Sequence, residues 1–217
     1  MTKMLELNKI YCGDCLEYMR EMPDKCVDLV LTDPPYGIGF SNNPVRQEYK
    51  KNDYDETRPD SKHFKELFRV SNNQIICGGN YYNLPISRGW IFWYKHQPVD
   101  NLADGELIWT SFDRVVKCFD YPYTNVMQGN GSRTEARYHP NQKPLALMMW
   151  CLEKYSKEGM TVLDPFMGSG TTCVACKKLG RNYIGIEKEP AYIEIALKRL
   201  EKVNNHKITD FFQGAEA

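Results

Sequence analysis

The amino-acid sequence predicts a single α/β domain built around a mostly parallel sheet. Short apolar runs typical of strands alternate with segments in which apolar residues recur at helical spacing. Two of the strand-like runs, residues 27–31 and 161–163, end at an Asp-Pro turn, and the second turn is rich in glycine. A length of 217 residues is enough for one sizeable hydrophobic core. The chain shows no internal repeat or low-complexity linker that would divide it.

The first elements indicate a strand-helix-strand unit with parallel strands. Residues 9–12 are typical of a short strand, and a helix follows through Leu16, Met19 and Met22. The next strand, residues 27–31, is almost continuously apolar, as expected for a strand that is covered on both faces.

The middle of the chain is predicted less completely. Residues 41–63 carry mixed charge and no apolar period, which indicates a long exposed loop. A helix at residues 64–70 and strands at 74–77 and 90–93 continue the alternation. Residues 107–116 fit no pattern well, and residues 125–137 are typical of a polar loop.

The last third shows the clearest pattern. Residues 145–155 have helical spacing, and a glycine at 159 follows that helix. A strand at 161–163, a helix at 172–179, a strand at 183–186 and a helix at 190–203 follow. The tail, residues 204–217, is expected to be peripheral.

Composition excludes some classes of protein. Lysine plus arginine equals aspartate plus glutamate, 28 each, so the chain is not broadly basic, and binding to nucleic acid would need a local patch. No run approaches the length of a membrane helix, and the N-terminus lacks the apolar core of a secretory signal, so we expect a cytoplasmic protein with reduced cysteines. The pairs Cys12/Cys15 and Cys173/Cys176 have the spacing of zinc ligands, but a turn and a packed helical face explain them better, and we expect no metal.

The segment Asp33-Pro34-Pro35-Tyr36 ends the strand at 27–31. Neither proline offers a backbone N–H and each fixes its own φ, so the strand cannot continue. Taken alone, the segment could be only a rigid turn with a core tyrosine. A stiff carbonyl beside a carboxylate is also a way to hold two hydrogen-bond acceptors in fixed directions.

The second Asp-Pro turn, residues 164–172, lies between a strand and a helix. Its glycines permit close approach of a ligand to backbone N–H groups at the start of the helix. Glu187 follows Asp164 by 23 residues, at the end of the next strand, where dinucleotide-binding folds place an acid on ribose hydroxyls. The pattern favours a nucleoside with a small carboxylate over a triphosphate, and S-adenosylmethionine has that form.

Together, "DPPYG" and "VLDPFMGSGTT" resemble the motifs of the DNA amino-methyltransferases, which methylate N6 of adenine or N4 of cytosine. The catalytic motif precedes the cofactor motif, as in the permuted β class of that family. The turn at 12–14 and the segments "HPNQKPLALMMWCLEKYS" and "YIGIEKEPAYIEIALKRL" match in register, so the resemblance covers residues 9–203. It implies a Rossmann-like fold with a mostly parallel, seven-stranded sheet.

The resemblance implies methyl transfer from S-adenosylmethionine to a base flipped out of duplex DNA. Asp33 and the Pro34 carbonyl would accept the amine hydrogens, Pro35 would help fix that carbonyl, and Tyr36 would stack on the base. Aspartate in the first position favours adenine, because the cytosine-N4 members more often carry serine there. Cytosine-N4 methylation, RNA methylation and a non-catalytic nucleic-acid-binding paralogue remain alternatives.

The resemblance also implies a set of cofactor-binding residues. Asp14 would face the adenine of the cofactor, although it could instead cap the following helix, or do both. Lys143 is either close to the cofactor or a solvated charge. The predicted set is Asp14, Lys143, Asp164, Pro165, Phe166, Gly168, Ser169, Gly170, Thr171 and Glu187.

Within the single domain, residues 1–217, we expect a catalytic half at about 1–95, a target-recognition segment at about 96–138, a cofactor-binding half at about 139–203, and the tail. The recognition segment is short, which suggests a small recognition sequence or help from a second subunit in a homodimer. Its basic residues, and those of the loop at 41–63, are candidates for DNA contact: Arg46, Lys50, Lys51, Arg114, Lys117, Arg133 and Arg137. A bacterial or viral role in restriction-modification, regulation or genome protection would suit such an enzyme.

Overall fold

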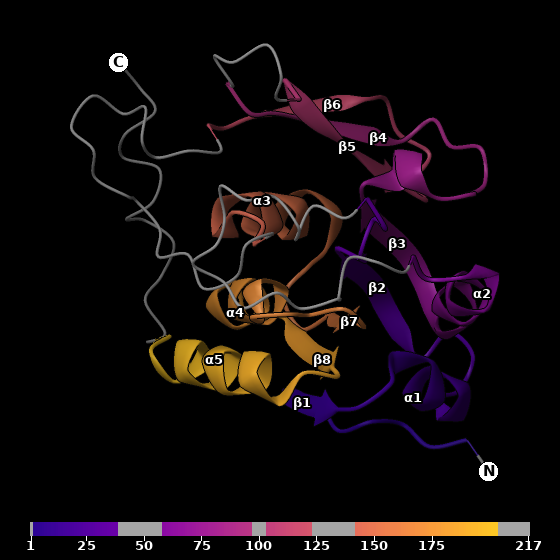
Figure 1. The fold of residues 1–217 in the computed structure, drawn as a ribbon, viewed down its shortest axis with the longest axis vertical. Coiled ribbons are helices and arrows are strands. Elements are labelled where there is room, and N and C mark those ends of the chain that lie inside the picture. Colours follow the sequence, from indigo (N-terminus) through magenta and orange to yellow (C-terminus); the bar gives the residue numbers. More distant parts are fainter. Residues whose placement is uncertain (1, 39–57, 97–102, 123–141, 204–217) are drawn as a thin grey trace.

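The computed structural model describes residues 2–38, 58–96, 103–122 and 142–203. Most of the predicted loop at 41–63, the polar loop at 125–137 and the tail lie outside these residues. The described chain forms one sheet of eight strands with helices on both faces (Figure 1). The predicted α/β class and mostly parallel sheet are therefore confirmed, with eight strands in place of the seven implied by the resemblance.

The sheet consists of a parallel region and a mixed region. Strands β1, β8, β7, β2 and β3 are parallel neighbours in that order, and β5, β4 and β6 extend the sheet beyond β3. β5 is antiparallel to both β3 and β4, whereas β6 is parallel to β4. The strand bounds are β1 Lys9–Cys12, β2 Val27–Thr32, β3 Ser71–Cys77, β4 Trp90–Tyr94, β5 Gly105–Thr110, β6 Lys117–Asp120, β7 Thr161–Asp164 and β8 Asn182–Glu187.

Two hydrophobic cores lie on the two faces of the sheet. Alternate strand residues serve opposite faces, so Leu29 and Leu31 join one core and Val30 joins the other. Figure 1 shows α1 and α2 on one side of the sheet and α3, α4 and α5 on the other. The helix bounds are α1 Cys15–Glu21, α2 Ser61–Val70, α3 Leu145–Tyr155, α4 Thr171–Lys178 and α5 Pro190–Glu201, and a 3-10 turn spans Gly79–Tyr81.

Two regions differ from the sequence prediction. Helix α2 begins at Ser61, earlier than the predicted 64, because the Asp60 side chain accepts hydrogen bonds from the first N–H groups of the helix. The unassigned region at 107–116 contains most of β5, which lies inside the sheet between β3 and β4. β5 and β6 belong to the range predicted to recognise the target, so the described part of that range contributes two strands to the sheet.

The parallel region sets the position of the candidate site. Because β1, β8, β7 and β2 run in the same direction, their carboxyl ends meet at one edge of the sheet. Asp14 and Asp33 follow β1 and β2 at this edge, and Glu187 and Asp164 are the last residues of β8 and β7. Open α/β sheets bind their ligands at this edge.

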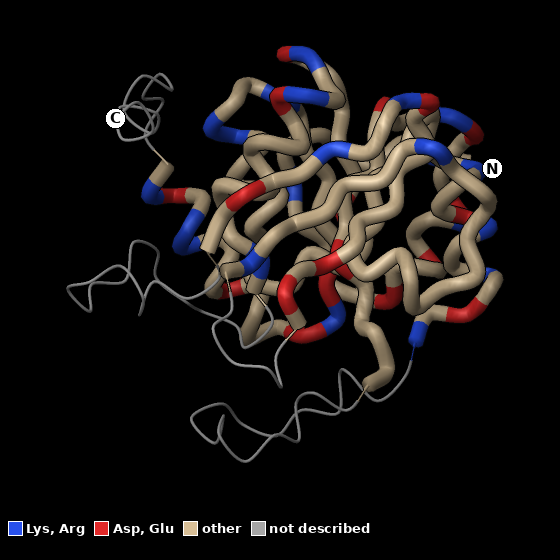
Figure 2. Tube along the Cα trace, turned by 90° about the horizontal axis from the view of Figure 1, so that it is seen from above, with Lys and Arg blue, Asp and Glu red and all other residues tan. Residues whose placement is uncertain are grey.

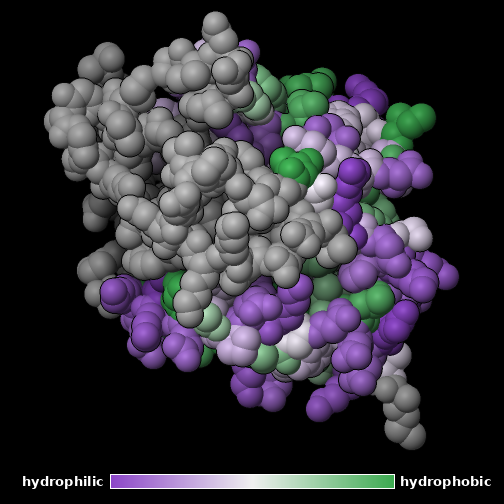
Figure 3. All heavy atoms as spheres, viewed as in Figure 1, coloured by the Kyte–Doolittle hydropathy of each residue, from purple (hydrophilic) through white to green (hydrophobic). Residues whose placement is uncertain are grey.

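The described chain is typical of globular α/β proteins in its surface charge, surface hydropathy, helix lengths and cysteine packing. Lysine and arginine positions are interspersed with aspartate and glutamate positions (Figure 2). On the face shown in Figure 3, the described surface is mainly hydrophilic with separate hydrophobic patches. None of the described helices has the length and apolar character that a membrane crossing requires. Cys173 and Cys176 are buried in α4, where they pack as small apolar side chains.

Candidate functional site

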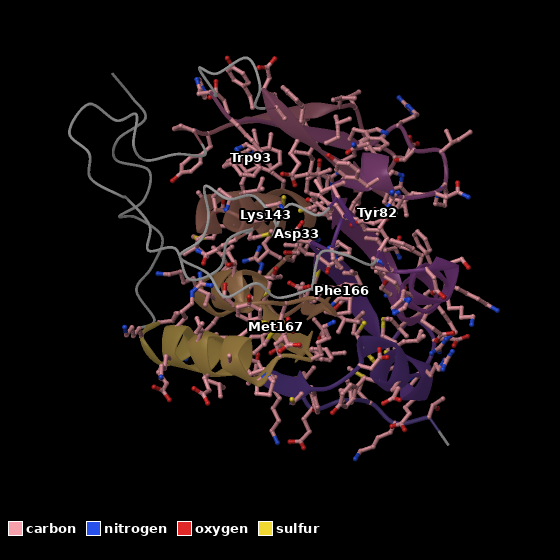
Figure 4. The ribbon with its side chains drawn as sticks, viewed as in Figure 1. Asp33, Tyr82, Trp93, Lys143, Phe166 and Met167 are labelled. Carbon is pink, nitrogen blue, oxygen red and sulfur yellow. The ribbon has the colours of Figure 1, made fainter. Side chains whose placement is uncertain are left out.

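Asp33 is the first residue after β2, and its two carboxylate oxygens have different partners. Oδ1 lies 2.7 Å from the Tyr36 hydroxyl, and Oδ2 accepts a hydrogen bond of 2.7 Å from the Lys143 ammonium. The Asp33 side chain is 20% exposed, so it is accessible from the edge of the sheet. Figure 4 shows Asp33 and Lys143 close together at the centre of the molecule. The structure thus joins two residues that sequence analysis assigned to different roles.

Glu106, on β5, completes this cluster and was not predicted. Its Oε1 lies 2.5 Å from the Tyr36 hydroxyl and 3.1 Å from the Lys143 ammonium, while Oε2 accepts from Lys95, the residue after β4, at 2.9 Å. The Tyr36 hydroxyl has a single hydrogen, so it donates to only one of the two carboxylates at a time. No signal in the sequence identifies it, because a glutamate is usually exposed and the sequence does not show that this one is largely buried.

Charges within the cluster determine its protonation. Burial raises the pKa of Asp33; Lys143 opposes this rise and Glu106 adds to it. Burial also acts to raise the pKa of Glu106, but Lys143 and Lys95 together lower it to about 2. The two carboxylates raise the pKa of Lys143, despite its burial, and burial raises the pKa of Tyr36 well above its ordinary value. At neutral pH, Glu106 is therefore ionised, Lys143 is charged and Tyr36 is neutral.

Three tyrosines surround the Asp-Pro-Pro turn. Tyr36 stacks on Tyr81, with ring centroids 4.7 Å apart and an interplanar angle of 18°. The Tyr82 hydroxyl donates to the Pro34 carbonyl at 2.8 Å and lies 3.2 Å from the Pro35 carbonyl. One face of Tyr36 is thus occupied by another aromatic ring, and the Pro34 carbonyl already has one donor. A carbonyl oxygen has two lone pairs, so it can accept a second hydrogen bond.

Gly78 makes the position of Tyr36 possible. It follows β3 with φ of +63°, and a Cβ atom there would lie 2.4 Å from Tyr36 Cε1. The residue therefore needs both the left-handed backbone and the missing side chain. The tip of β3 and the turn after β2 fit together only because this position is glycine.

The glycine-rich turn after β7 is tied to the end of β2. Asp164 is buried, and its Oδ1 accepts from the Thr32 hydroxyl at 2.7 Å and from the Phe166 N–H at 3.1 Å. Burial raises the pKa of Asp164 to about 6. Asp164 therefore holds the turn in place and links it to the residue that precedes Asp33.

The conformation of this turn depends on its glycines and on Arg199. Gly168 and Gly170 have positive φ angles, and a Cβ on Gly170 would lie 2.7 Å from the side chain of Ala196 in α5. The buried Arg199 guanidinium, also from α5, donates to the Ser169 carbonyl at 2.7 Å and lies 3.1 Å from the hydroxyls of Ser169 and Thr171. Sequence analysis missed Arg199, since a helical arginine usually lies on the surface.

The acids at the ends of β8 and β1 lie on neighbouring strands. Glu187 accepts from the Gly168 N–H at 2.9 Å, so it contacts the glycine turn directly, and burial raises its pKa. Asp14 is exposed and caps α1 by accepting from the Leu16 N–H at 2.8 Å. The capping alternative for Asp14 is thus observed, and its other oxygen remains at the edge of the sheet. A nucleoside suits this set of acceptors, because exposed and half-buried carboxylates can accept from ribose hydroxyls and an amine.

His63 and Phe166 add rings to the same region. The ligand atoms of His63 lie within 4.8 Å of those of Asp14 and Cys15. The rings of His63 and Phe166 have centroids 6.2 Å apart. An adenine ring would find apolar and aromatic surface here, beside the two acids.

A second group of metal-ligating atoms among the described residues comprises Asp33, Cys77 and Glu106. The Lys143 ammonium bonds both carboxylates of that group. Lysine thus supplies the positive charge that a cation would bring.

Predicted residues outside this cluster have other surroundings. Arg114, a candidate for DNA contact, donates to the Lys154 carbonyl at 2.8 Å and lies over the Tyr155 ring. It is therefore engaged with α3. Of the other candidates, Lys117 begins β6, and the arginines and lysines at 46, 50, 51, 133 and 137 lie outside the described residues.

The fold and this cluster together define a class of enzyme. A mostly parallel sheet carries a nucleoside-type turn after β7 and a rigid pair of hydrogen-bond acceptors after the adjacent β2. That arrangement suits an enzyme that holds a nucleoside cofactor beside a substrate group with hydrogens to donate, as the family resemblance implies.

Comparisons with known proteins identify the family. Residues 40–198 match the N6_N4_Mtase family model, described as DNA methylase. The type II methyltransferase M.HinfI of Haemophilus influenzae is 30% identical over 251 residues, which cover 91% of this chain and 69% of the relative. The type II methyltransferase M2.MboI of Moraxella bovis is 27% identical over 242 residues, covering 89% and 88%.

Comparison with solved structures finds the same fold in DNA methyltransferases. The complex of M1.HpyAVI with S-adenosylmethionine superposes with a TM-score of 0.57 at 25% identity, covering 88% of this chain and 98% of the other. The PvuII cytosine-N4-specific DNA methyltransferase has the same fold, with a TM-score of 0.61 at 15% identity and coverage of 91% and 88%.

The chain belongs to the N6/N4 DNA methylase family. The family is dependent on S-adenosylmethionine and acts on DNA, so the cofactor and the substrate class expected from the sequence are confirmed.

Proposed function

We propose that this protein transfers a methyl group from S-adenosylmethionine to N6 of an adenine that is flipped out of duplex DNA. The observation that carries the proposal is the hydrogen bond of 2.7 Å between Thr32 and Asp164. It joins the Asp33-Pro34 acceptor pair to the glycine-rich turn across 132 residues of sequence. Methyl donor and acceptor amine would therefore meet at one place.

Asp33 and Pro34 are proposed to accept the two hydrogens of the amine. The amine lone pair of adenine is delocalised into the ring, and two acceptors would draw density back to the nitrogen as it attacks. The N–C bond would form as the S–CH₃ bond breaks, with the electron pair left on sulfur, and the nitrogen would then release a proton to Asp33 or to solvent. Prolines at 34 and 35 hold the carbonyl in direction without competing N–H groups.

Tyr36, whose ring stacks on Tyr81 and has its centroid 5.1 Å from the Lys143 ammonium, is proposed to pack against the flipped base. The Tyr82 hydroxyl would keep the Pro34 carbonyl oriented and leave it one lone pair for the amine. Asp33, Pro34, Pro35 and Tyr36 thus form the proposed catalytic motif.

The cofactor is proposed to lie over the turn after β7. Gly168, Ser169, Gly170 and Thr171 would approach its amino-acid end, with Asp164 and Pro165 holding the turn. Glu187 would accept from the ribose hydroxyls and Asp14 from the adenine amine, beside Phe166. Lys143, which bonds Asp33 and Glu106, would lie at the methyl-transfer end of the cofactor.

Adenine is preferred over cytosine because aspartate occupies the first position of the motif, a feature carried by the family resemblance. We also propose that residues of the 96–138 range outside β5 and β6 recognise the target, and that a second copy of the chain completes the DNA contact. Analytical ultracentrifugation with and without duplex DNA tests the dimer. A monomeric complex on DNA would contradict it.

The proposed reaction is tested by transfer of labelled methyl groups to unmethylated duplex DNA, single-stranded DNA and RNA. Label in duplex DNA, recovered as N6-methyladenine, is the expected result. Recovery as N4-methylcytosine would overturn the base assignment, and label only in RNA would overturn the substrate. Tight cofactor binding without transfer to any of the three would favour a non-catalytic protein.

A further inference from the structure

Glu106 bonds the two groups that hold Asp33. The Tyr36 hydroxyl lies between Asp33 Oδ1 and Glu106 Oε1, and the Lys143 ammonium lies between Asp33 Oδ2 and Glu106 Oε1. Two carboxylates therefore share one hydroxyl and one ammonium. The four groups come from the turn after β2, from β5 and from the segment before α3.

The other oxygen of Glu106 is held by the residue that follows β4. Lys95 donates to Oε2 at 2.9 Å, and the side chains of Glu106, Lys95 and Lys143 are 10%, 16% and 7% exposed. Two acids and two lysines make the cluster neutral, which is the condition for burying charges without a large desolvation penalty. Lys95 also lies over the ring of Trp93, 4.7 Å from its centroid. Both carboxylate oxygens of Glu106 thus have partners that fix the side chain.

Sharing Lys143 affects what Asp33 can do. If Lys143 paired with Asp33 alone, the ammonium would compete with an incoming amine for the carboxylate lone pairs. In the structure the ammonium is shared, since it lies 2.7 Å from Asp33 and 3.1 Å from Glu106, and the contact with Glu106 takes up part of its hydrogen bonding. The second carboxylate therefore leaves Asp33 freer to accept the hydrogens of a substrate.

We propose that Glu106 is a positioning residue for methyl transfer: it shares Lys143 and Tyr36 with Asp33 and so keeps the Asp33 carboxylate available to the substrate amine. The inference rests on the proposed function, in which Asp33 accepts from that amine. Lys95 holds Glu106 in place and so contributes to the same positioning of Asp33.

The proposal has a consequence for pH dependence. Glu106 lies close enough to raise the pKa of Asp33, so removing its charge lowers that pKa. The acid limb of activity, which follows ionisation of Asp33, then moves to lower pH. The titratable and charged groups around Asp33 among the described residues are Tyr36, Cys77 on β3, Glu106 on β5, Lys143 before α3 and Asp164 on β7.

The test uses the full chain with Glu106→Gln, which keeps the shape and an acceptor for Tyr36 but removes the charge. Single-turnover methyl transfer to duplex DNA is measured from pH 5 to 9, together with the Kd for S-adenosylmethionine. We expect the plateau rate to fall about 10- to 100-fold, as for loss of a charged hydrogen bond. The acid limb should move to lower pH while cofactor affinity stays the same. Glu201→Gln, on the exposed end of α5, is the matched control.

Two further variants keep the test decisive. Lys95→Met combined with Glu106→Gln removes one charge of each sign, so this variant should fold even if Glu106→Gln does not, and it should show the same two changes. An unchanged plateau rate, or a lower plateau with an unmoved acid limb, would overturn the proposal. Asp33→Asn separates the two claims, because full activity of that variant would contradict the proposed function itself.

Discussion

Lys143 is one of the residues through which the two halves of the candidate site contact one another. It approaches Asp33 from 110 residues away and bonds Glu106 as well. Sequence analysis left it as either a cofactor neighbour or a solvated charge, and the second alternative is wrong because its side chain is only 7% exposed. No local pattern distinguishes a buried lysine from a surface one, since the distinction depends on carboxylates from distant strands.

Replacing Lys143 with methionine should destabilise the protein strongly. The change leaves Asp33 and Glu106 buried without the cation that they share, and removal of one partner from a buried ion pair typically costs about 3–5 kcal/mol. Urea unfolding at pH 7 measures the loss, with the exposed Lys157→Met as the control.

The pH dependence of that loss provides a second check. Without Lys143 the pKa of Asp33 rises further, and the folded state then binds a proton more tightly than the unfolded chain does. The deficit of Lys143→Met should therefore shrink as the pH falls and Asp33 becomes protonated. A deficit that is small at pH 7, or constant with pH, would contradict the ion-pair account.

Among the elements, the turn after β7 is held in place by a buried acid, Asp164, whose ionisation costs folding free energy. Asp164 has a pKa of about 6 in the folded protein, above its ordinary value of 3.8. Because the folded-state pKa is raised, the ionised group destabilises the fold as the pH rises through this interval. Asp164→Asn keeps the acceptor oxygen for Thr32 and Phe166 and removes the charge.

We therefore expect Asp164→Asn to gain stability relative to the wild type as the pH rises from about 4 to 7. A shift of two pKa units corresponds to about 3 kcal/mol. Unfolding free energies of both proteins across that range measure the difference. Parallel curves would show that the carboxyl group of Asp164 does not titrate in this interval.

A substitution at Gly78 tests the contact between the end of β3 and the Asp-Pro-Pro-Tyr motif after β2. In Gly78→Ala the new Cβ would meet the ring of Tyr36, which is stacked on Tyr81 and cannot easily move. Methyl transfer should fall by about tenfold or more, in addition to a backbone strain of about 1–2 kcal/mol.

Gly159→Ala is the matched control for Gly78→Ala, because Gly159 has φ of +79° and open space around its Cβ position. It should show the backbone strain but retain activity. Equal activity of the two variants, measured at saturating cofactor, would contradict a role for the Gly78 contact.

Secondary structure could be predicted where elements follow local patterns. Helix α3 and the strands β2, β7 and β8 agree closely with the predicted ranges, since apolar periodicity and glycine turns set their limits. β5 could not be predicted, because its apolar residues follow Glu106, a charge that is stable inside the sheet only through Lys95 and Lys143. The formation of β5 therefore depends on tertiary contacts, which a local sequence pattern does not show.

At the scale of the whole molecule, the sheet order explains how a permuted chain builds one site. β2 precedes β7 by more than a hundred residues, yet the two are parallel neighbours and their carboxyl ends meet. Asp33, Asp164 and Glu187, which the family motifs marked, therefore lie at one edge of the sheet. Glu106, Lys95 and Arg199 were missed because no motif in the sequence marks them.

The central claim is that the Asp33 motif directs a methyl group to N6 of adenine in DNA. The most direct measurement is mass spectrometry of nucleosides from duplex DNA incubated with S-adenosylmethionine and either the wild-type protein or Asp33→Ala. We expect N6-methyladenine with the wild type and none above background with the variant, at equal cofactor affinity. N6-methyladenine at the same level with both proteins, or its absence with the wild type, would contradict the claim.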